Sequence, residues 1–168
     1  QATFDEVWLH RAKQLADYTI KHFYDVADGS GMFYFTSDLD AALIARKMEL
    51  QDNVIPASNS VMANNLFLLG NYFENEKYLE ISSQMMHTMQ TKVVKWGSSY
   101  SNWCMMLLNY TTPFYEVAIA GRDAGQLAHA FGAYYLPGKI LIGSTGESEL
   151  PLLENKLVKG ETMIYVCV

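Results

Sequence analysis

The stretch from Ser60 to Phe73 constrains the fold most, because its apolar residues occupy nearly every face of a helix. A helix of this kind must be surrounded by other elements to be stable in water. Two further helical patterns follow it, an amphipathic one over Lys77 to Gln90 and a mostly apolar one over Tyr100 to Tyr110. Alternating buried and amphipathic helices are typical of consecutive helical hairpins that form an inner and an outer layer.

The residues before this stretch divide into a helix and a long connection. Residues 3–26 carry apolar side chains near the helical period, and we expect this helix to end near Asp28 to Gly31, where two glycines allow a turn. The aromatic run from Met32 to Thr36 favours a short strand or a hairpin arm. The remainder, up to Pro56, predicts a long structured loop, and such loops in compact domains are more often functional than not.

After Pro113 the pattern changes from helical to mixed. Four short segments predict strand, helix, strand and strand in turn: Glu116–Gly121, Gln126–Leu136, Lys139–Ser144 and Thr162–Cys167. Tight connections between the first three predict a parallel strand pair with a right-handed crossover. We therefore expect a mostly α protein with two domains, helical hairpins over residues 1–112 and a small α/β unit over residues 113–168.

Composition excludes several classes of function. The 168 residues carry a net charge of −6 with a pI near 5.1, and they contain no basic run of the kind that binds nucleic acid. Every apolar run is broken before the roughly 20 residues that a membrane span needs, and no signal-peptide pattern opens the chain, so we expect a cytoplasmic location. The four histidines and two cysteines lack metal or redox spacing, so we expect no metal and no cofactor.

A dense polar run lies before the buried helix. It contains Asp52, Asn53, Ser58, Asn59 and Ser60. One interpretation is structural, because Pro56 keeps its neighbour extended while Ser58 or Asn59 caps the helix by accepting a free N–H. The other is a ligand pocket at the helix N-terminus, where positive partial charge attracts anions and polarised hydroxyl groups.

Carboxylate pairs are the candidates for acid–base chemistry. Two such groups can act as acid and base when their surroundings move their pKa values apart. Glu49 with Asp52 is one candidate pair, and Asp38 with Asp40 is another. Neither spacing is diagnostic, since most such pairs are solvated surface acids.

Several segments together resemble a known family. DNVIPASNS, preceded by Ala45, Arg46 and Glu49, is similar to a signature of thioredoxin-domain-containing proteins that include the bacterial YyaL proteins and the spermatogenesis-associated relatives of animals. GMFYF, EVAIAG, YLPGKILIG and the terminal strand with Cys167 extend the resemblance over nearly the whole chain. The resemblance implies a thioredoxin-like domain followed by an α/α toroid like those of N-acylglucosamine 2-epimerases and six-hairpin glycosidases. Because this chain has no CxxC motif, the resemblance implies the C-terminal part of such a protein, without its N-terminal portion.

The resemblance also implies roles for individual residues, because in such toroids the loops that lead into inner helices line a central pocket. Glu49 and Asp52 would be the catalytic carboxylates. The substrate-binding groups would be Tyr34, by stacking, and Asn53, Ser58 and Asn59, by hydrogen bonding. The expected ligand is a carbohydrate and the expected chemistry is of isomerase or epimerase type in the full-length protein. We expect this chain alone to be inactive, because a toroid pocket draws residues from many hairpins.

A rival hypothesis makes the chain a non-catalytic scaffold or interaction module for a redox domain elsewhere in a longer protein. The polar run would then only cap helices and help to dock the missing part. Under either hypothesis, a partial toroid leaves apolar surface on its inner helices uncovered. We therefore expect either self-association or coverage by the missing N-terminal portion.

Overall fold

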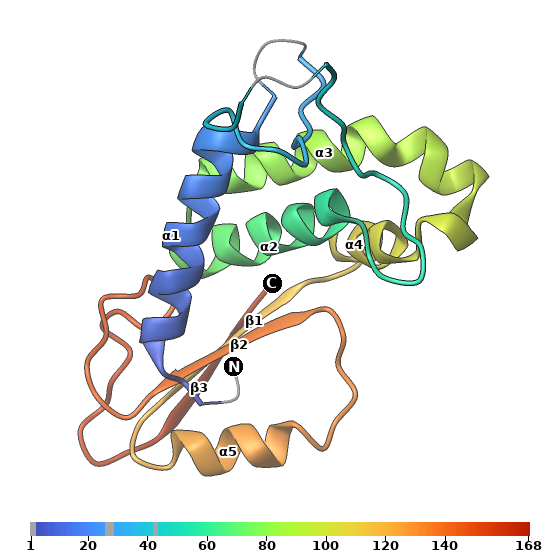
Figure 1. Ribbon diagram of the computed structural model, residues 1–168. Coiled ribbons are helices and arrows are strands. Elements are labelled where there is room, and N and C mark those ends of the chain that lie inside the picture. Colours follow the sequence, from blue (N-terminus) through green and yellow to red (C-terminus); the bar gives the residue numbers. More distant parts are fainter. Residues whose placement is uncertain (1–2, 26–28, 42–43) are drawn as a thin grey trace. The chain divides into compact units, whose positions relative to one another are not determined.

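The computed structural model describes residues 3–25, 29–41 and 44–168 of the chain (Figure 1). The chain forms two compact units. The helical unit consists of Val7–Asn71 and Asn75–Leu107, and the sheet unit consists of Leu108–Val168 with Tyr72–Glu74 and the described part of Gln1–Glu6. The domain boundary predicted at residues 112 and 113 remains a prediction.

The helical unit is built from four α-helices and a short 3₁₀ turn within its described residues. These are α1 (Glu6–Phe23), α2 (Ser58–Phe73), α3 (Glu76–Lys95), η1 (Gly97–Ser99) and α4 (Ser101–Thr111). The prediction of a buried helix after the polar run is confirmed by α2, where Ala63 and Leu66 are fully buried. The predicted amphipathic stripe is confirmed by α3, which buries Met85 and Met89 on one face.

Helices α2 and α3 form an antiparallel hairpin (Figure 1). Asn75 caps α3 by accepting a hydrogen bond from the backbone N–H of Tyr78. Close contact near the turn depends on Gly70, because a Cβ atom there would lie 2.5 Å from a methyl carbon of Leu79. The hairpin therefore packs tightly at the end where α2 meets α3.

The connection from α1 to α2 differs in part from its prediction. Helix α1 ends at Phe23, before the predicted end near Asp28 to Gly31, and an antiparallel bridge pairs Tyr24 with Phe33. Of the predicted range, Asp28 lies outside the described residues. The expected strand at Met32 to Thr36 is reduced to this single bridge, because the backbone N–H of Met32 donates to the hydroxyl of Ser30 and that of Phe35 donates to the carbonyl oxygen of Lys47 in the loop. Gly29 and Gly31 adopt positive φ angles of 66° and 68°, as expected for a turn.

The sheet unit contains β1 (Tyr115–Ala120), α5 (Ala124–Phe131), β2 (Lys139–Ser144) and β3 (Met163–Cys167). The strand order is β2-β1-β3. The predicted parallel pair is confirmed, with Val117 opposite Leu141, and β3 pairs with β1 in the antiparallel sense. The α5 helix is shorter than predicted because it ends before Gly132, with Pro137 a few residues beyond.

A small core holds this unit together. Val117, Ile119 and Leu141 on one sheet face pack with Ala124, and the ring of Phe4 lies against them. The ring of Phe4 also lies so close to Gly143 that no side chain fits at that position. The structure thus confirms a mostly helical chain with a small mixed sheet. No helix in the described part of the chain is long and apolar enough to cross a membrane.

Candidate functional site

Asp52 lies at the centre of the polar run and is buried, with 5% of its surface exposed. One carboxylate oxygen accepts hydrogen bonds from the backbone N–H of Ala57 at 2.9 Å and from the hydroxyl of Ser60 at 2.6 Å. The other accepts from the backbone N–H groups of Asn102 at 2.9 Å and Trp103 at 3.5 Å. A single carboxylate therefore caps the N-terminal ends of both α2 and α4, where negative charge is favourable.

Asn59 is fully buried and ties the loop to α2. Its amide nitrogen donates to the carbonyl oxygens of Phe33 and Glu49, each at 2.9 Å, and its amide oxygen accepts from the N–H of Phe33 at 2.8 Å. The side chain of Asn59 thus pairs with the backbone of Phe33 as a neighbouring strand would. Nearby, a carboxylate oxygen of Glu49 accepts from the backbone N–H of Ser58 at 2.9 Å.

The remaining members of the polar run are positioned differently. Asn53 is exposed, and its backbone N–H donates to the carbonyl oxygen of Ile55. Ser60 is buried, and its hydroxyl accepts from the side chain of Asn102 at 3.0 Å while donating to Asp52. The start of α2 is thus capped by the carboxylates of Asp52 and Glu49, whereas the expectation that Ser58 or Asn59 accepts the free N–H is wrong for Asn59, whose amide oxygen accepts from Phe33. The catalytic and binding roles predicted for the run remain predictions.

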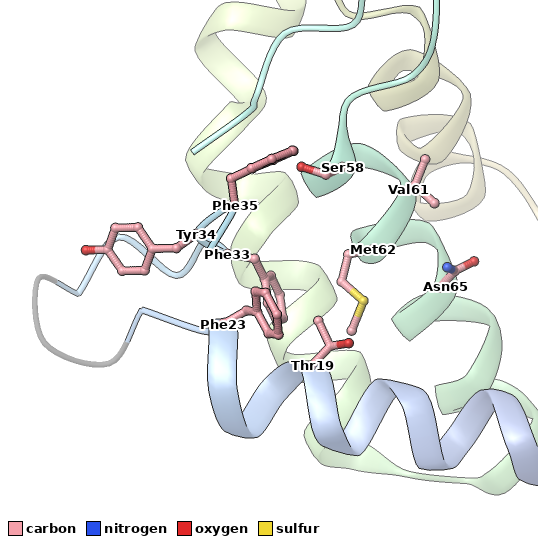
Figure 2. Close-up of a pocket in the computed structure, with 9 residues that line it drawn as sticks. All are labelled: Thr19, Phe23, Phe33, Tyr34, Phe35, Ser58, Val61, Met62 and Asn65. Atoms are coloured by element: carbon pink, nitrogen blue, oxygen red, sulfur yellow. The ribbon is translucent and has the colours of Figure 1, made fainter. Parts of the chain in front are cut away.

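A cavity of about 380 Å³ lies beside the first half of α2 (Figure 2). Its lining is mostly apolar and comes from three segments: Thr19 and Phe23 of α1; Phe33, Tyr34 and Phe35; and Ser58, Val61, Met62 and Asn65 of α2. Of the residues predicted for the site, Tyr34 and Ser58 line this cavity, whereas the side chains of Asp52 and Asn59 are used within the capping network.

The aromatic side chains of the cavity point in different directions. Figure 2 shows Phe23 and Phe33 beside Thr19 and Met62, Phe35 extending toward Ser58, and Tyr34 pointing away from α2. The Tyr34 ring has the guanidinium group of Arg46 4.1 Å from its centroid, which is a cation–π contact. Phe23, Phe33 and Phe35 therefore form the aromatic wall of the cavity.

The alternative carboxylate pair does not share one site. The carboxylate of Asp38 lies 2.7 Å from a ring nitrogen of His22. The carboxylate of Asp40 instead accepts a hydrogen bond from the backbone N–H of Ser37. The hydrogen bond from His22 holds the pKa of the Asp38 carboxyl below its ordinary value, with the charges of His22 and Arg46 acting in the same direction. This contact fastens the loop to the end of α1.

Sequence reasoning missed two features of the described residues. Asn102 and Trp103 belong to the Asp52 network, and no local spacing connects them to a residue so far along the chain. In the sheet unit, burial raises the pKa of the Glu116 carboxyl and the charge of Glu74 raises it further, while Lys156 opposes the shift. Within the part of the chain that the structure describes, no cluster of His, Cys, Asp and Glu could hold a metal ion.

Comparison with known proteins finds distant relatives. The chain is 24% identical over 178 residues to spermatogenesis-associated protein 20 of Homo sapiens, covering 99% of this chain and 22% of that protein. The proteins of the same name from Rattus norvegicus and Mus musculus are also 24% identical, over 177 residues. No family model and no solved structure matches. The chain thus spans about a fifth of the length of curated relatives to which it is distantly similar over nearly its whole length.

Proposed function

We propose that this chain is a segment of a longer protein and that the cavity beside α2 binds a carbohydrate. The observation that carries the proposal is a cavity with an aromatic wall and with polar groups from the first half of α2. The cavity volume, about 380 Å³, falls within the range of small-molecule pockets, roughly 300–1,000 Å³. The distant similarity to much longer proteins supports the first part of the proposal.

The chemistry of the wall suits a sugar ring. A pyranose ring has C–H groups that pack on aromatic faces and hydroxyl groups that need donors and acceptors at the edge. Phe23, Phe33 and Phe35 supply the apolar surface, and Ser58 and Asn65 supply a hydroxyl and an amide from α2. Ser58 and Asn65 lie two helical turns apart on the same face of α2, so both groups border the same cavity.

In this proposal Asp52 and Asn59 hold the wall in place, since each side chain is bonded to backbone groups that support it. For the longer protein we propose epimerase-like or other carbohydrate-processing chemistry, with Glu49 and Asp52 as its carboxylates. Asn53 would be a further polar contact to the sugar. A cytoplasmic location and α/α toroid architecture for that protein belong to the same proposal.

A second candidate function is a non-catalytic scaffold that serves a thioredoxin-like redox domain outside this chain. The observation that favours it is the Asp52 carboxylate, whose two oxygens are both occupied by helix-capping donors. A carboxylate used in this way fixes the relative position of two helices without any ligand.

The two candidates differ in a thermal-shift experiment with a panel of neutral mono- and disaccharides, applied to the chain and to a longer protein that contains it. A sugar that binds only the folded state raises the melting temperature. We expect Phe35→Ala to abolish that rise without lowering the melting temperature of the free chain, because Phe35 is 65% exposed.

Tyr135→Ala is the matched control, because Tyr135 is an exposed aromatic residue that does not line the cavity. It should leave the sugar response unchanged. If no sugar stabilises either polypeptide, or if Phe35→Ala and Tyr135→Ala respond alike, the carbohydrate proposal fails and the scaffold remains.

A further inference from the structure

Helix α1 has two apolar faces, and only one of them is used within the described structure. On the inner face Ala16 is buried, with Leu9, Ile20 and Phe23 partly buried beside it. On the other face four large side chains are half or more exposed, which we call the outer stripe: Val7 (54%), Trp8 (65%), Leu15 (68%) and Tyr18 (50%). At 3.6 residues per turn they fall within about 100° of one another, the width of a stripe that packs against a neighbour.

The charges on this side of α1 are basic. Arg11 lies within the outer stripe and Lys21 lies beside it, and neither forms an ion pair with another described residue. The acidic residue Asp17 lies outside the outer stripe, one helical turn before Lys21, and its carboxylate accepts hydrogen bonds from Lys13 and Tyr78. At the end of the stripe, His22 is already bound by Asp38.

This local charge contrasts with the net charge of −6 for the whole chain. Two copies that paired through the outer stripe would bring Arg11 near its own counterpart, and like charges across an interface oppose association. A partner with acidic groups beside its apolar residues would instead gain favourable pairs with Arg11 and Lys21. Charge complementarity therefore selects against a second copy.

We propose that the outer stripe docks an acidic amphipathic helix contributed by the polypeptide that lies outside these residues in a longer protein. The helix would present apolar residues at positions i, i+3, i+4 and i+7, flanked by Asp and Glu. The matched region is only 22% of the human relative, so most of a protein of that kind lies outside it. The proposal rests on the longer-protein part of the proposed function and not on the carbohydrate cavity.

The surface can be tested with two synthetic helical peptides of about 18 residues, the length of α1. Both carry the same leucine stripe, one flanked by glutamate and the other by lysine. In a Trp96→Phe chain the exposed indole of Trp8 reports binding, because Trp103 is fully buried. We expect the acidic peptide to shift Trp8 emission to the blue and protect it from iodide, and the basic peptide to bind roughly tenfold more weakly.

Variants distinguish binding at the outer stripe from non-specific hydrophobic binding. Leu15→Glu should abolish binding, whereas Val94→Glu, at an equally exposed apolar position on α3, should leave it unchanged. Arg11→Glu should reverse the preference toward the basic peptide. Circular dichroism checks that each variant retains its helices.

Three results would overturn the proposal: equal binding of both peptides, binding that survives Leu15→Glu, or a concentration-dependent dimer in sedimentation that Leu15→Glu removes. In a longer polypeptide, Trp8 should be protected without any peptide. If Trp8 there is open to iodide and the acidic peptide still binds, the helix comes from a separate protein and the in-chain source is wrong. A failed sugar panel with successful peptide binding would remove only the carbohydrate proposal.

Discussion

At the scale of single residues, Asp52 is the member of the polar run whose side chain links two helices. Its carboxylate accepts from donors on two helices, and all of these donors are buried or partly buried. Asp52→Asn replaces one oxygen with an amide N–H group that faces other donors. We expect a loss of about 2 kcal/mol in the free energy of unfolding, the cost of leaving buried donors without an acceptor. Urea denaturation measures it.

Asn53→Ala is the control for Asp52→Asn, because Asn53 is adjacent but exposed. Its substitution should change stability by less than about 0.5 kcal/mol. A small effect of Asp52→Asn together with a lost sugar response would contradict the capping role and favour the catalytic interpretation of Asp52.

Asp17 makes the stability of the helical unit depend on pH in the acidic range. Burial raises the pKa of its carboxyl, but hydrogen bonds from Tyr78 and Lys13 and the charges of Lys13 and Lys77 outweigh this and hold it below its ordinary value of 3.8. A lowered folded-state pKa contributes stability that is present above pH 3.8 and is lost as the pH falls through the folded value.

Tyr78→Phe removes one hydrogen bond to Asp17 and should lower stability at pH 7 by about 1 kcal/mol. The difference between Tyr78→Phe and the unchanged chain should shrink as the pH falls below 3.8, because protonated Asp17 no longer favours the bond. Urea denaturation at pH 7 and pH 3 measures both values. A difference that is constant with pH would mean that Tyr78 acts only through packing.

At the scale of elements, periodicity and turn residues predicted most of the fold. The β2 strand is placed as expected, and α2 and α3 differ from their predictions only at their ends, because long periodic runs bury the same face whatever surrounds them. The strand predicted at Met32 to Thr36 is reduced to one bridge, because only Phe33 pairs with another backbone segment in a strand-like manner. In the site, the polar run indicated that the start of α2 is capped, but the acceptors are Asp52 and Glu49 in place of the predicted Ser58 or Asn59. The contact of Asp52 with α4 depends on tertiary packing, which local sequence does not show.

The turn between β1 and α5 gives an element-scale prediction. Gly121 has a φ angle of 136°, and a Cβ atom there would lie 2.5 Å from the carbonyl oxygen of Glu161 and from Cα of Thr162. Gly121→Ala should therefore lower the free energy of unfolding by about 3 kcal/mol, through strain and displacement of the backbone before β3. Gly146→Ala meets no atom within 4 Å and should be neutral or slightly stabilising. Equal effects of the two substitutions in urea denaturation would show that the turn relaxes at little cost.

At the scale of the whole molecule, a low charge density accompanies exposed apolar side chains. Trp8, Leu15 and Phe35 are each about two-thirds exposed, while a net charge of −6 at pH 7 keeps molecules apart. This repulsion disappears near the pI of about 5.1. Near this pH, association through the exposed apolar surface should therefore be strongest.

We therefore expect a solubility minimum near pH 5, measured by light scattering between pH 4 and pH 8. Above the pI, Leu15→Glu should reduce scattering, because it adds a negative charge to a negative chain and interrupts the outer stripe. Gln14→Glu adds the same charge next to the stripe and preserves its apolar side chains. If Gln14→Glu is as effective as Leu15→Glu, net charge alone controls association. If scattering does not vary with pH, charge repulsion is not what keeps the apolar surfaces of separate molecules apart.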